Sequence, residues 1–287
     1  MSKAKSMRGA LFLLAVTLFW STTFSFTKEV LTSISPIEYI GVRFFLAALP
    51  LCIYNAIKGF KRNSLGPGVV LGVTFFMAIW LQSLGIEHTT ASNAAFVTGL
   101  NVIIVCVAEA IIYRRRPSYL LLLAIIFSVM GLYLMSSFEV LTMGKGDLLV
   151  LLSSFFWAAQ ILLIDQFSKN YDGLSLSFLQ ILVVGIIGLA LALAQTKFVN
   201  IVSSTFQVLP QILYLAFVCS TLALTLQIIG QKYATPTLAA LIFLLEPVFA
   251  AVFARIILAE VISLNQIIGA ILLLISTVLA TIDKIHK

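Results

Sequence analysis

The chain has 287 residues, of which 61% are hydrophobic and only 10% are charged, and its formal net charge is +7. Soluble globular domains carry about 25% charged and about 45–50% apolar residues, so this composition excludes an ordinary soluble domain. It predicts an integral membrane protein, in which the positive charge is better explained by topology than by binding to nucleic acid.

Ten apolar stretches are long enough, or nearly so, to cross a bilayer core of about 30 Å as helices. They are too long and too uniformly apolar for barrel strands. Helices also satisfy their own backbone hydrogen bonds in lipid. We therefore expect an all-α integral membrane protein with ten transmembrane helices, at about residues 9–28, 36–57, 67–86, 90–113, 118–138, 147–167, 174–195, 208–230, 235–258 and 263–283.

The first span begins with "MSKAKSMRGALFLLAVTLFW", in which a basic segment is followed by an apolar run, as in a signal peptide. Its apolar part is longer than the roughly 7–15 residues of a signal-peptide core, and no clear small-x-small cleavage site follows. We expect this segment to be retained as a transmembrane helix.

Lysine and arginine are distributed unevenly over the ends of the predicted spans. With a cytoplasmic N-terminus and ten alternating spans, thirteen of the 18 basic residues fall on the cytoplasmic side and four on the other, while Arg43 lies inside a span. Cytoplasmic loops of membrane proteins carry an excess of lysine and arginine. The pattern predicts a multi-pass protein of the cell (inner) membrane with both termini in the cytoplasm.

The two halves of the chain repeat each other. The tripeptide ending at Trp20 returns 137 residues later, ending at Trp157, and "LQSLG" from Leu81 returns as "LQIIG" from Leu226, at a spacing of 145. The eight additional residues fit the loop "TKFVNIVSSTFQ" of the second half. The predicted repeats are residues 7–138 and 146–284, with five helices each.

Five is an odd number, so the second repeat enters the membrane from the opposite side and the two repeats are inverted. Inverted repeats recur in secondary transporters, where they support states that open to either side around a site near the midplane. We therefore expect a carrier that works by alternating access. A channel and a purely structural membrane protein remain alternatives.

The carboxy-terminal stretch "PTLAALIFLLEPVFAAVFARIILAEVISLNQIIGAILLL" resembles the end of an EamA domain, from the drug/metabolite transporter superfamily, through Glu246-Pro247, Glu260 and Gly269. The first half resembles the amino-terminal EamA copy through Trp20, Arg43 and "TTASNAAFVTGLNV". The resemblance implies a ten-helix carrier of small organic solutes, such as amino acids, related metabolites or drugs, and often an exporter.

The chain departs from the family pattern at two places. Asn101-Val102 stands in the fourth span where a proline is common, and Arg115 aligns with Glu260. Pro247 removes a backbone donor and bends its helix. We therefore expect a strong kink in the ninth helix and none in the fourth.

Two ionisable residues lie within predicted spans. Glu246 is near the middle of the ninth span, and Arg43 is in the second. Charged groups in membrane helices usually face the protein interior or a wet cavity. Glu246 is a candidate for solute binding or proton coupling, and a structural carboxyl is the alternative. Arg43 is a candidate ligand of a solute carboxylate, and a structural ion pair is the alternative.

Two tryptophans and three amides complete the candidate solute site. Trp20 and Trp157 lie at equivalent midplane positions, and Gln82 and Gln227 are also repeat partners. Asn101 is the repeat partner of Glu246, and a helical wheel groups it with Thr90, Asn93 and Thr98. Each of these side chains lines a cavity or, as the alternative, joins helices by packing or hydrogen bonds.

Other site chemistry is not expected. Cys52, Cys106 and Cys219 lie in separate spans without CxxC spacing, and the chain has 2 histidines, so no disulfide framework or metal site is predicted. We find no P-loop and no G-x-S-x-G motif, so an intramembrane enzyme is only an alternative. We expect no enzyme activity and no cofactor.

The expected partners follow from this assignment. They are a small-molecule solute and the lipid bilayer, with no nucleic acid. Gly131 in the fifth span and Gly269 in the tenth permit close helix packing, so these two spans are expected at the periphery, where they could form a homodimer.

Two further acidic residues are assigned from their positions. Asp165 falls at the end of a span and is expected to be solvated. Glu109 lies before the arginine run that starts at Arg114 and is expected to pair with it.

Overall fold

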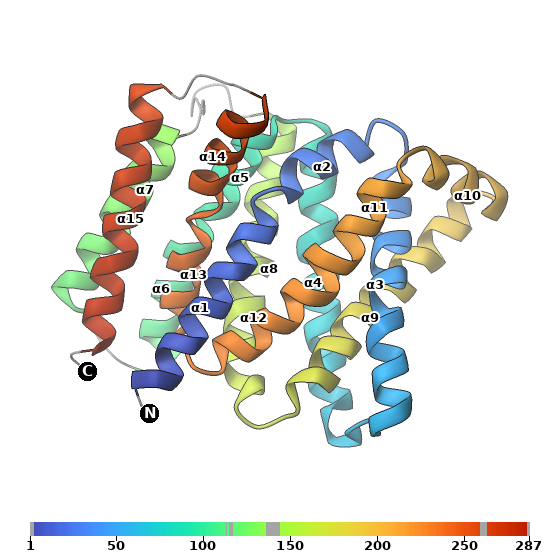
Figure 1. Cartoon of the computed structure of the whole chain (residues 1–287), viewed down its shortest axis with the longest axis horizontal. Helices are drawn as coiled ribbons and strands as arrows, with labels where there is room; N and C mark the ends of the chain where they lie inside the picture. Colours follow the sequence, from blue (N-terminus) through green and yellow to red (C-terminus); the bar gives the residue numbers. More distant parts are fainter. Residues whose placement is uncertain (1–2, 113, 115–116, 136–143, 259–262, 286–287) are drawn as a thin grey trace.

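Helices make up every regular element of the computed structural model, which describes residues 3–112, 114, 117–135, 144–258 and 263–285 (Figure 1). Arg115 and Glu260, the aligned pair at the second departure from the family pattern, lie outside the described residues. The first half contains α1 (Lys3–Trp20), α2 (Thr23–Val30), α3 (Pro36–Lys58), α4 (Leu65–Glu87), α5 (Ala91–Gly99), α6 (Asn101–Ile112) and α7 (Tyr119–Met135), with a 3₁₀ turn at Arg62–Ser64.

The second half contains α8 (Lys145–Ser168), α9 (Gly173–Gln195), α10 (Phe198–Gln207), α11 (Leu209–Ala216), a π-helical segment (Phe217–Leu222), α12 (Ala223–Gln231), α13 (Pro236–Phe243), α14 (Glu246–Leu258) and α15 (Leu264–Ile285). Within the described chain nine segments have the length and hydropathy to cross a membrane, and α7 is a shorter apolar helix of 17 residues. The predicted all-α membrane fold is confirmed.

Local sequence signals fix the ends of the second span. Ser35 and Glu38 form a capping box, in which each side chain accepts a hydrogen bond from the backbone N–H of the other, and Pro36 follows at the first helical position. The helix α3 ends before Gly59, whose φ of 87° is a left-handed conformation that glycine adopts readily. Asp172 caps α9 and Thr235 caps α13 in a similar way.

The inverted repeat is visible in the helix packing. In the repeat, α8 corresponds to α1 and α2, and α12 corresponds to the end of α4. The structure packs α4 against α8, and it packs their copies, α12 and α1, against each other. The helices α3 and α9 correspond to each other and pack together, and so do α7 and α15. Two of these contacts, α4 with α8 and α1 with α12, are copies of each other, and the other two join a helix to its own copy. This is the pattern expected for two halves related by a two-fold axis.

Glycines mark the closest of these contacts. A Cβ on Gly9 would lie 2.8 Å from the carbonyl oxygen of Gly230, and a Cβ on Gly85 would lie 2.7 Å from that of Gly146. Gly146 follows Gly9 by 137 residues and Gly230 follows Gly85 by 145, so the two contacts are repeat copies. Small residues let membrane helices approach backbone to backbone.

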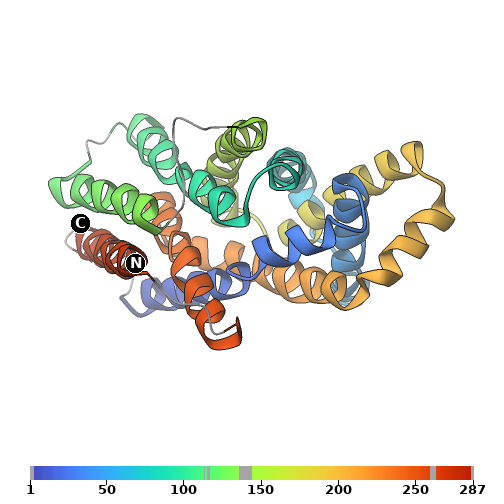
Figure 2. The same cartoon turned by 90° about the horizontal axis from the view of Figure 1, so that it is seen from above.

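The helices α7 and α15 lie side by side at one edge of the molecule (Figures 1 and 2). Gly131 and Gly269 face each other there, since a Cβ on Gly131 would lie 2.8 Å from the carbonyl oxygen of Gly269. The two glycines that suggested a homodimer are thus used for packing within the chain. The peripheral position of these helices agrees with the expectation.

The fourth and ninth spans are both interrupted near their middles, so the expectation that the fourth helix is unkinked is wrong. The fourth breaks at Leu100, between α5 and α6, and the ninth at Leu244 and Leu245, between α13 and α14. The two spans pack on each other, and a Cβ on Gly99 would lie 2.9 Å from the side chain of Leu244. Mutual packing of the two turns explains why the fourth span breaks without a proline.

Three charged side chains outside the cavity have partners within the protein: Lys28 and Glu109 bind helix ends, and Asp165 forms an ion pair. Lys28 donates hydrogen bonds to the carbonyl oxygens of Ile86 and Glu87, the last two residues of α4, and to that of Thr89 just beyond the helix. Glu109 accepts two hydrogen bonds from Thr237 at the start of α13. It forms no ion pair with Arg114, and the rest of the arginine run with which it was expected to pair lies outside the described residues. Asp165 is 1% exposed and forms an ion pair with Lys169, so its expected solvation is wrong.

The additional residues of the second half form the helix α10 instead of an irregular loop. It lies at the edge of the molecule opposite α7 and α15 (Figure 2). Its apolar side chains Phe198, Val199 and Phe206 are exposed, while Ile201 packs against the protein. The N-terminal end of α1 and the C-terminal end of α15 lie on the same side of the bundle, opposite α2 (Figure 1). A chain that starts and ends on the same side crosses the membrane an even number of times.

Candidate functional site

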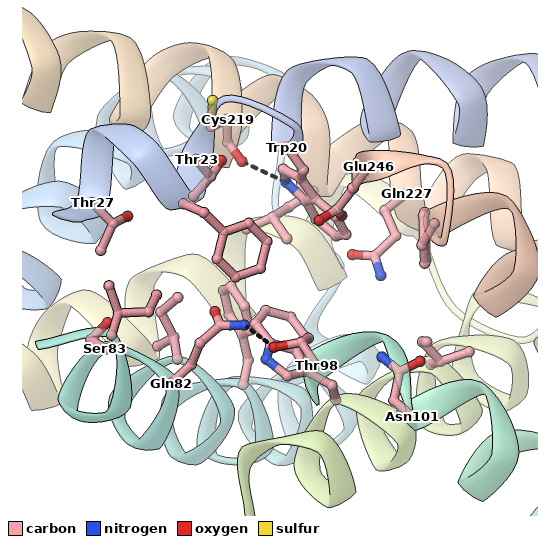
Figure 3. A pocket seen from close by; sticks show the side chains of 18 of the residues that line it. Trp20, Thr23, Thr27, Gln82, Ser83, Thr98, Asn101, Cys219, Gln227 and Glu246 are labelled. Carbon is pink, nitrogen blue, oxygen red and sulfur yellow. Dashed lines mark hydrogen bonds between the residues drawn. The ribbon is translucent and has the colours of Figure 1, made fainter. Parts of the chain in front are cut away.

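A cavity between the two halves holds about 720 Å³ of space not occupied by atoms. All seven candidate residues from the sequence line it, so the structure brings them together from seven different spans. Figure 3 labels five of them, Trp20, Gln82, Asn101, Gln227 and Glu246. The lining consists of Trp20, Thr23, Phe24, Thr27, Arg43, Phe75, Ile79, Gln82, Ser83, Ile86, Thr98, Asn101, Trp157, Ile161, Cys219, Leu224, Gln227, Phe243 and Glu246. It is an apolar, aromatic surface with a small number of polar groups, as is usual for small-molecule sites.

The repeat-related tryptophans form an aromatic wall in this cavity. The ring centroids of Trp20 and Trp157 are 6.2 Å apart, Trp20 lies 5.2 Å from Phe243, and Trp157 lies 5.4 Å from Phe75. Their indole nitrogens differ. Nε1 of Trp20 donates to the carbonyl oxygen of Cys219 over 3.0 Å, whereas Nε1 of Trp157 is buried without a partner among the described residues.

This difference predicts unequal effects of phenylalanine substitution. Trp20→Phe keeps an aromatic ring but removes the donor to Cys219, so we expect it to lower the free energy of unfolding by about 1 kcal/mol more than Trp157→Phe does. Thermal unfolding of both variants in the same detergent measures the difference. Equal losses would show that the hydrogen bond of Trp20 contributes nothing to stability.

Arg43 is 3% exposed and is held by neutral groups. Its Nε donates to the hydroxyl of Ser220 over 2.8 Å, and a second guanidinium nitrogen donates to the hydroxyl of Tyr39. The guanidinium carbon lies 4.9 Å from the ring centroid of Phe44, within the range of a cation–π contact. The described residues provide no carboxylate within salt-bridge distance, so the structural ion pair that was the alternative for Arg43 is absent from them.

Glu246 begins α14, directly after the break in the ninth span. Its carboxyl group borders the cavity and has no hydrogen bond or ion pair with another described residue. Figure 3 shows it on the same side of the cavity as Trp20 and Gln227. The cavity therefore contains a cationic and an acidic side chain that do not pair with each other.

The amide side chains are placed around the same space. Gln82 donates to the hydroxyl of Thr98 over 3.0 Å, and the side-chain oxygen of Gln227 is buried without a partner among the described residues. Asn101 begins α6, the position that corresponds to Glu246 in α14. Each amide retains hydrogen-bonding capacity toward the cavity.

The expected polar arc of the fourth span is only partly correct. Thr98 and Asn101 line the cavity, but Thr90 caps α5 by accepting from the backbone N–H of Asn93. A helical wheel assumes a continuous helix, and the break at Leu100 changes the direction of the residues before it.

Other lining residues were missed. Thr23 and Thr27 follow Trp20 at helical spacing, a signal that was present in the sequence. Tyr39, which was also missed, does not line the cavity but lies four residues before Arg43 on the same helix face and accepts a hydrogen bond from its guanidinium. Within the described chain no group of three or more histidine, cysteine, aspartate or glutamate side chains could hold a metal ion.

Comparison with known proteins assigns the fold and family. The sequence pattern of the EamA-like transporter family matches residues 7–137 and again residues 144–282. An uncharacterized transporter of Archaeoglobus fulgidus is 29% identical over 278 residues, covering 97% of this chain and 87% of that protein. The uncharacterized transporter YyaM of Bacillus subtilis is 25% identical, covering 94% and 92% of the two chains. A protein crystal structure superposes with a TM-score of 0.77 and 13% identity, covering 97% of this chain and 99% of the other.

Proposed function

Since the chain belongs to the EamA-like transporter family, we propose that it is a secondary carrier of small organic solutes that works by alternating access. The proposed solutes are amino acids, related metabolites or drugs, and the proposed direction is export. The family is one of transporters, not of enzymes, and the chain is a multi-pass membrane protein.

One observation carries this proposal: both halves contribute equivalent positions to a single cavity. Trp20 and Trp157, Gln82 and Gln227, and Asn101 and Glu246 are repeat partners, and all six side chains line it. The same holds for three further pairs, Phe24 with Ile161, Ile79 with Leu224, and Thr98 with Phe243. A site on the pseudo-two-fold axis can be reached from either side by equivalent movements of the two halves.

The membrane orientation is also a proposal. The excess of lysine and arginine supports cytoplasmic termini in the cell (inner) membrane. The outer faces of α7 and α15 expose Ile126, Met130 and Ile271, which would contact lipid or a second copy in a homodimer. Fusion of a reporter to the C-terminus tests this orientation, and a reporter signal on the external side would show that the termini are not in the cytoplasm.

The proposed function is tested first by binding. We expect a subset of amino acids, organic acids, nucleosides and drugs to raise the melting temperature of the purified protein, because a ligand at about 100 times its Kd adds about 2.7 kcal/mol of stability. Flux of the best ligands into proteoliposomes should saturate and show counterflow. Flux that rises in proportion to concentration without counterflow would indicate a channel instead.

Replacing Glu246 by glutamine tests its part in this function. We expect flux of an identified solute to fall about tenfold or more, because hydrogen bonds to charged groups contribute about 1.5–3 kcal/mol. The melting temperature should change little, since the carboxyl group has no partner among the described residues. Glu87→Gln, at the exposed end of α4, is the matched control, and unchanged flux in Glu246→Gln would exclude a role in binding or coupling.

A further inference from the structure

Three glutamines lie together beside the cavity without lining it. Gln160 on α8, Gln180 on α9 and Gln231 at the end of α12 are 0%, 0% and 1% exposed. Gln160 donates to the side-chain oxygen of Gln180 over 2.6 Å, and Gln231 donates to the backbone oxygen of Ile161 over 3.1 Å. Each of the three glutamines still has a buried polar atom without a partner among the described residues.

Unpaired buried polar atoms are unusual, because a donor or acceptor removed from water without a partner destabilises the folded state. Three of them lie in this cluster, so these amides have hydrogen-bonding capacity that the described residues do not use. Gln160 is one turn from Trp157 and next to Ile161, both of which line the cavity, so the cluster lies directly beyond the cavity wall.

The repeat shows what the cluster corresponds to. By the spacings of 137 and 145 residues, Gln160 is the copy of Thr23, Gln180 of Arg43 and Gln231 of Ile86. Thr23, Arg43 and Ile86 all line the cavity. The positions therefore line the cavity in one half of the molecule, whereas their copies in the other half do not.

Two further repeat pairs show the same difference. Thr27 and Ser83 line the cavity, and Figure 3 shows both at one end of it. Their copies, Ile164 and Ile228, do not line the cavity and pack together instead. The cavity thus extends from its symmetric centre toward the membrane face where α2 and α4 end, and it is closed toward the face of the two termini.

We propose that Gln160, Gln180 and Gln231 form a second polar binding station, which lines the pathway when the carrier opens toward the face of the termini. This inference rests on the proposed alternating access. Exchange of the two halves' conformations would remove Thr23, Arg43 and Ile86 from the cavity lining and bring their copies into it. The solute, and the water that accompanies it, then provide the missing partners of the amide groups.

The chemistry of the second station defines the class of solute. An amide group donates through its NH₂ and accepts through its oxygen, so the station binds a solute that carries both an oxygen acceptor and an N–H or O–H donor. Arg43 offers a cation at the equivalent place on the other side. A carboxylate of the solute accepts hydrogen bonds at both places, from a cationic donor at Arg43 and from an uncharged amide donor at Gln180, and the bond to Arg43 is the stronger because both of its partners are charged.

Single cysteines read by a membrane-impermeant methanethiosulfonate reagent test this proposal without knowledge of the solute. The background carries Cys52→Ser, Cys106→Ala and Cys219→Ser, and each variant is reconstituted and exposed to reagent from one face at a time. We expect Gln160→Cys, Gln180→Cys and Gln231→Cys to be labelled from the face of the termini. Thr23→Cys should be labelled from the face where α2 and α4 end.

Two controls separate this inference from the proposed function. Ile164→Cys reports whether the pathway opens toward the termini at all, and Val107→Cys, on the lipid-facing surface, reports reagent that enters through lipid. Labelling of Ile164→Cys without labelling of the glutamine positions would overturn the second station and leave alternating access in place. Absence of labelling at all four positions from the face of the termini would overturn both. Because there are three glutamine positions, one variant that fails to fold does not remove the test.

Discussion

Gly188→Leu is expected to lower the free energy of unfolding by about 1–3 kcal/mol or more, the range for overpacking a tight interior. A Cβ at this position would lie 2.7 Å from the backbone nitrogen of Gly41 and 2.9 Å from its Cα atom. Backbone atoms of α3 cannot move aside as the end of a flexible side chain can. The helices α9, which contains Gly188, and α3 would therefore have to move apart where they pack together. Thermal unfolding in detergent would detect the resulting loss of stability.

Gly66→Leu is the matched control for this prediction. Gly66 is also helical, in the first turn of α4, but a Cβ there would meet no atom within 4 Å. Leucine has a higher helix propensity than glycine, so Gly66→Leu should be neutral or stabilising by up to about 1 kcal/mol. If both variants unfold at the temperature of the unchanged protein, the close approach of α3 and α9 does not contribute to stability.

The seven cavity residues could be predicted from the sequence because of the cost of polar groups in lipid. A residue such as Glu246 or Gln82 in an apolar span has to face the protein interior. The repeat then strengthened the prediction, since Trp20 with Trp157 and Gln82 with Gln227 recur at fixed spacings. Burial and position could be predicted in this way, whereas the roles of these residues in binding remain proposals.

Features that depend on contacts between distant segments could not be predicted. The break at Leu100 lies next to Gly99, which packs closely against Leu132 and Leu244, and the expectation for this span was based on its lack of a proline alone. The π-helical segment at Phe217–Leu222 exposes the carbonyl oxygen of Cys219 to Trp20, and no sequence signal indicated it. Which repeat copy is open and which is buried also depends on the conformation and not on the repeat itself.

Arg43→Gln is expected to weaken the binding of carboxylate-bearing solutes about tenfold or more, since hydrogen bonds to a charged group contribute about 1.5–3 kcal/mol. Gln180 is the repeat copy of Arg43, so the substitution places the same amide side chain at this position in both halves. It should change the free energy of unfolding by less than about 1 kcal/mol, because the cost of removing the guanidinium from water offsets much of what its hydrogen bonds contribute. The former partners also keep other hydrogen bonds, Tyr39 with Thr27 and Ser220 with the backbone oxygen of Leu215.

Esters provide the matched control for Arg43. For each acid that raises the melting temperature of the unchanged protein, the methyl ester lacks the carboxylate but retains the rest of the solute. Arg43→Gln should reduce the response to the acid and leave any response to the ester unchanged, whereas Arg62→Gln, at the exposed start of the 3₁₀ turn, should alter neither. A variant that binds acids as well as before but unfolds at a lower temperature would show that Arg43 serves the fold alone, since a guanidinium that binds solute has to distinguish the acid from its ester.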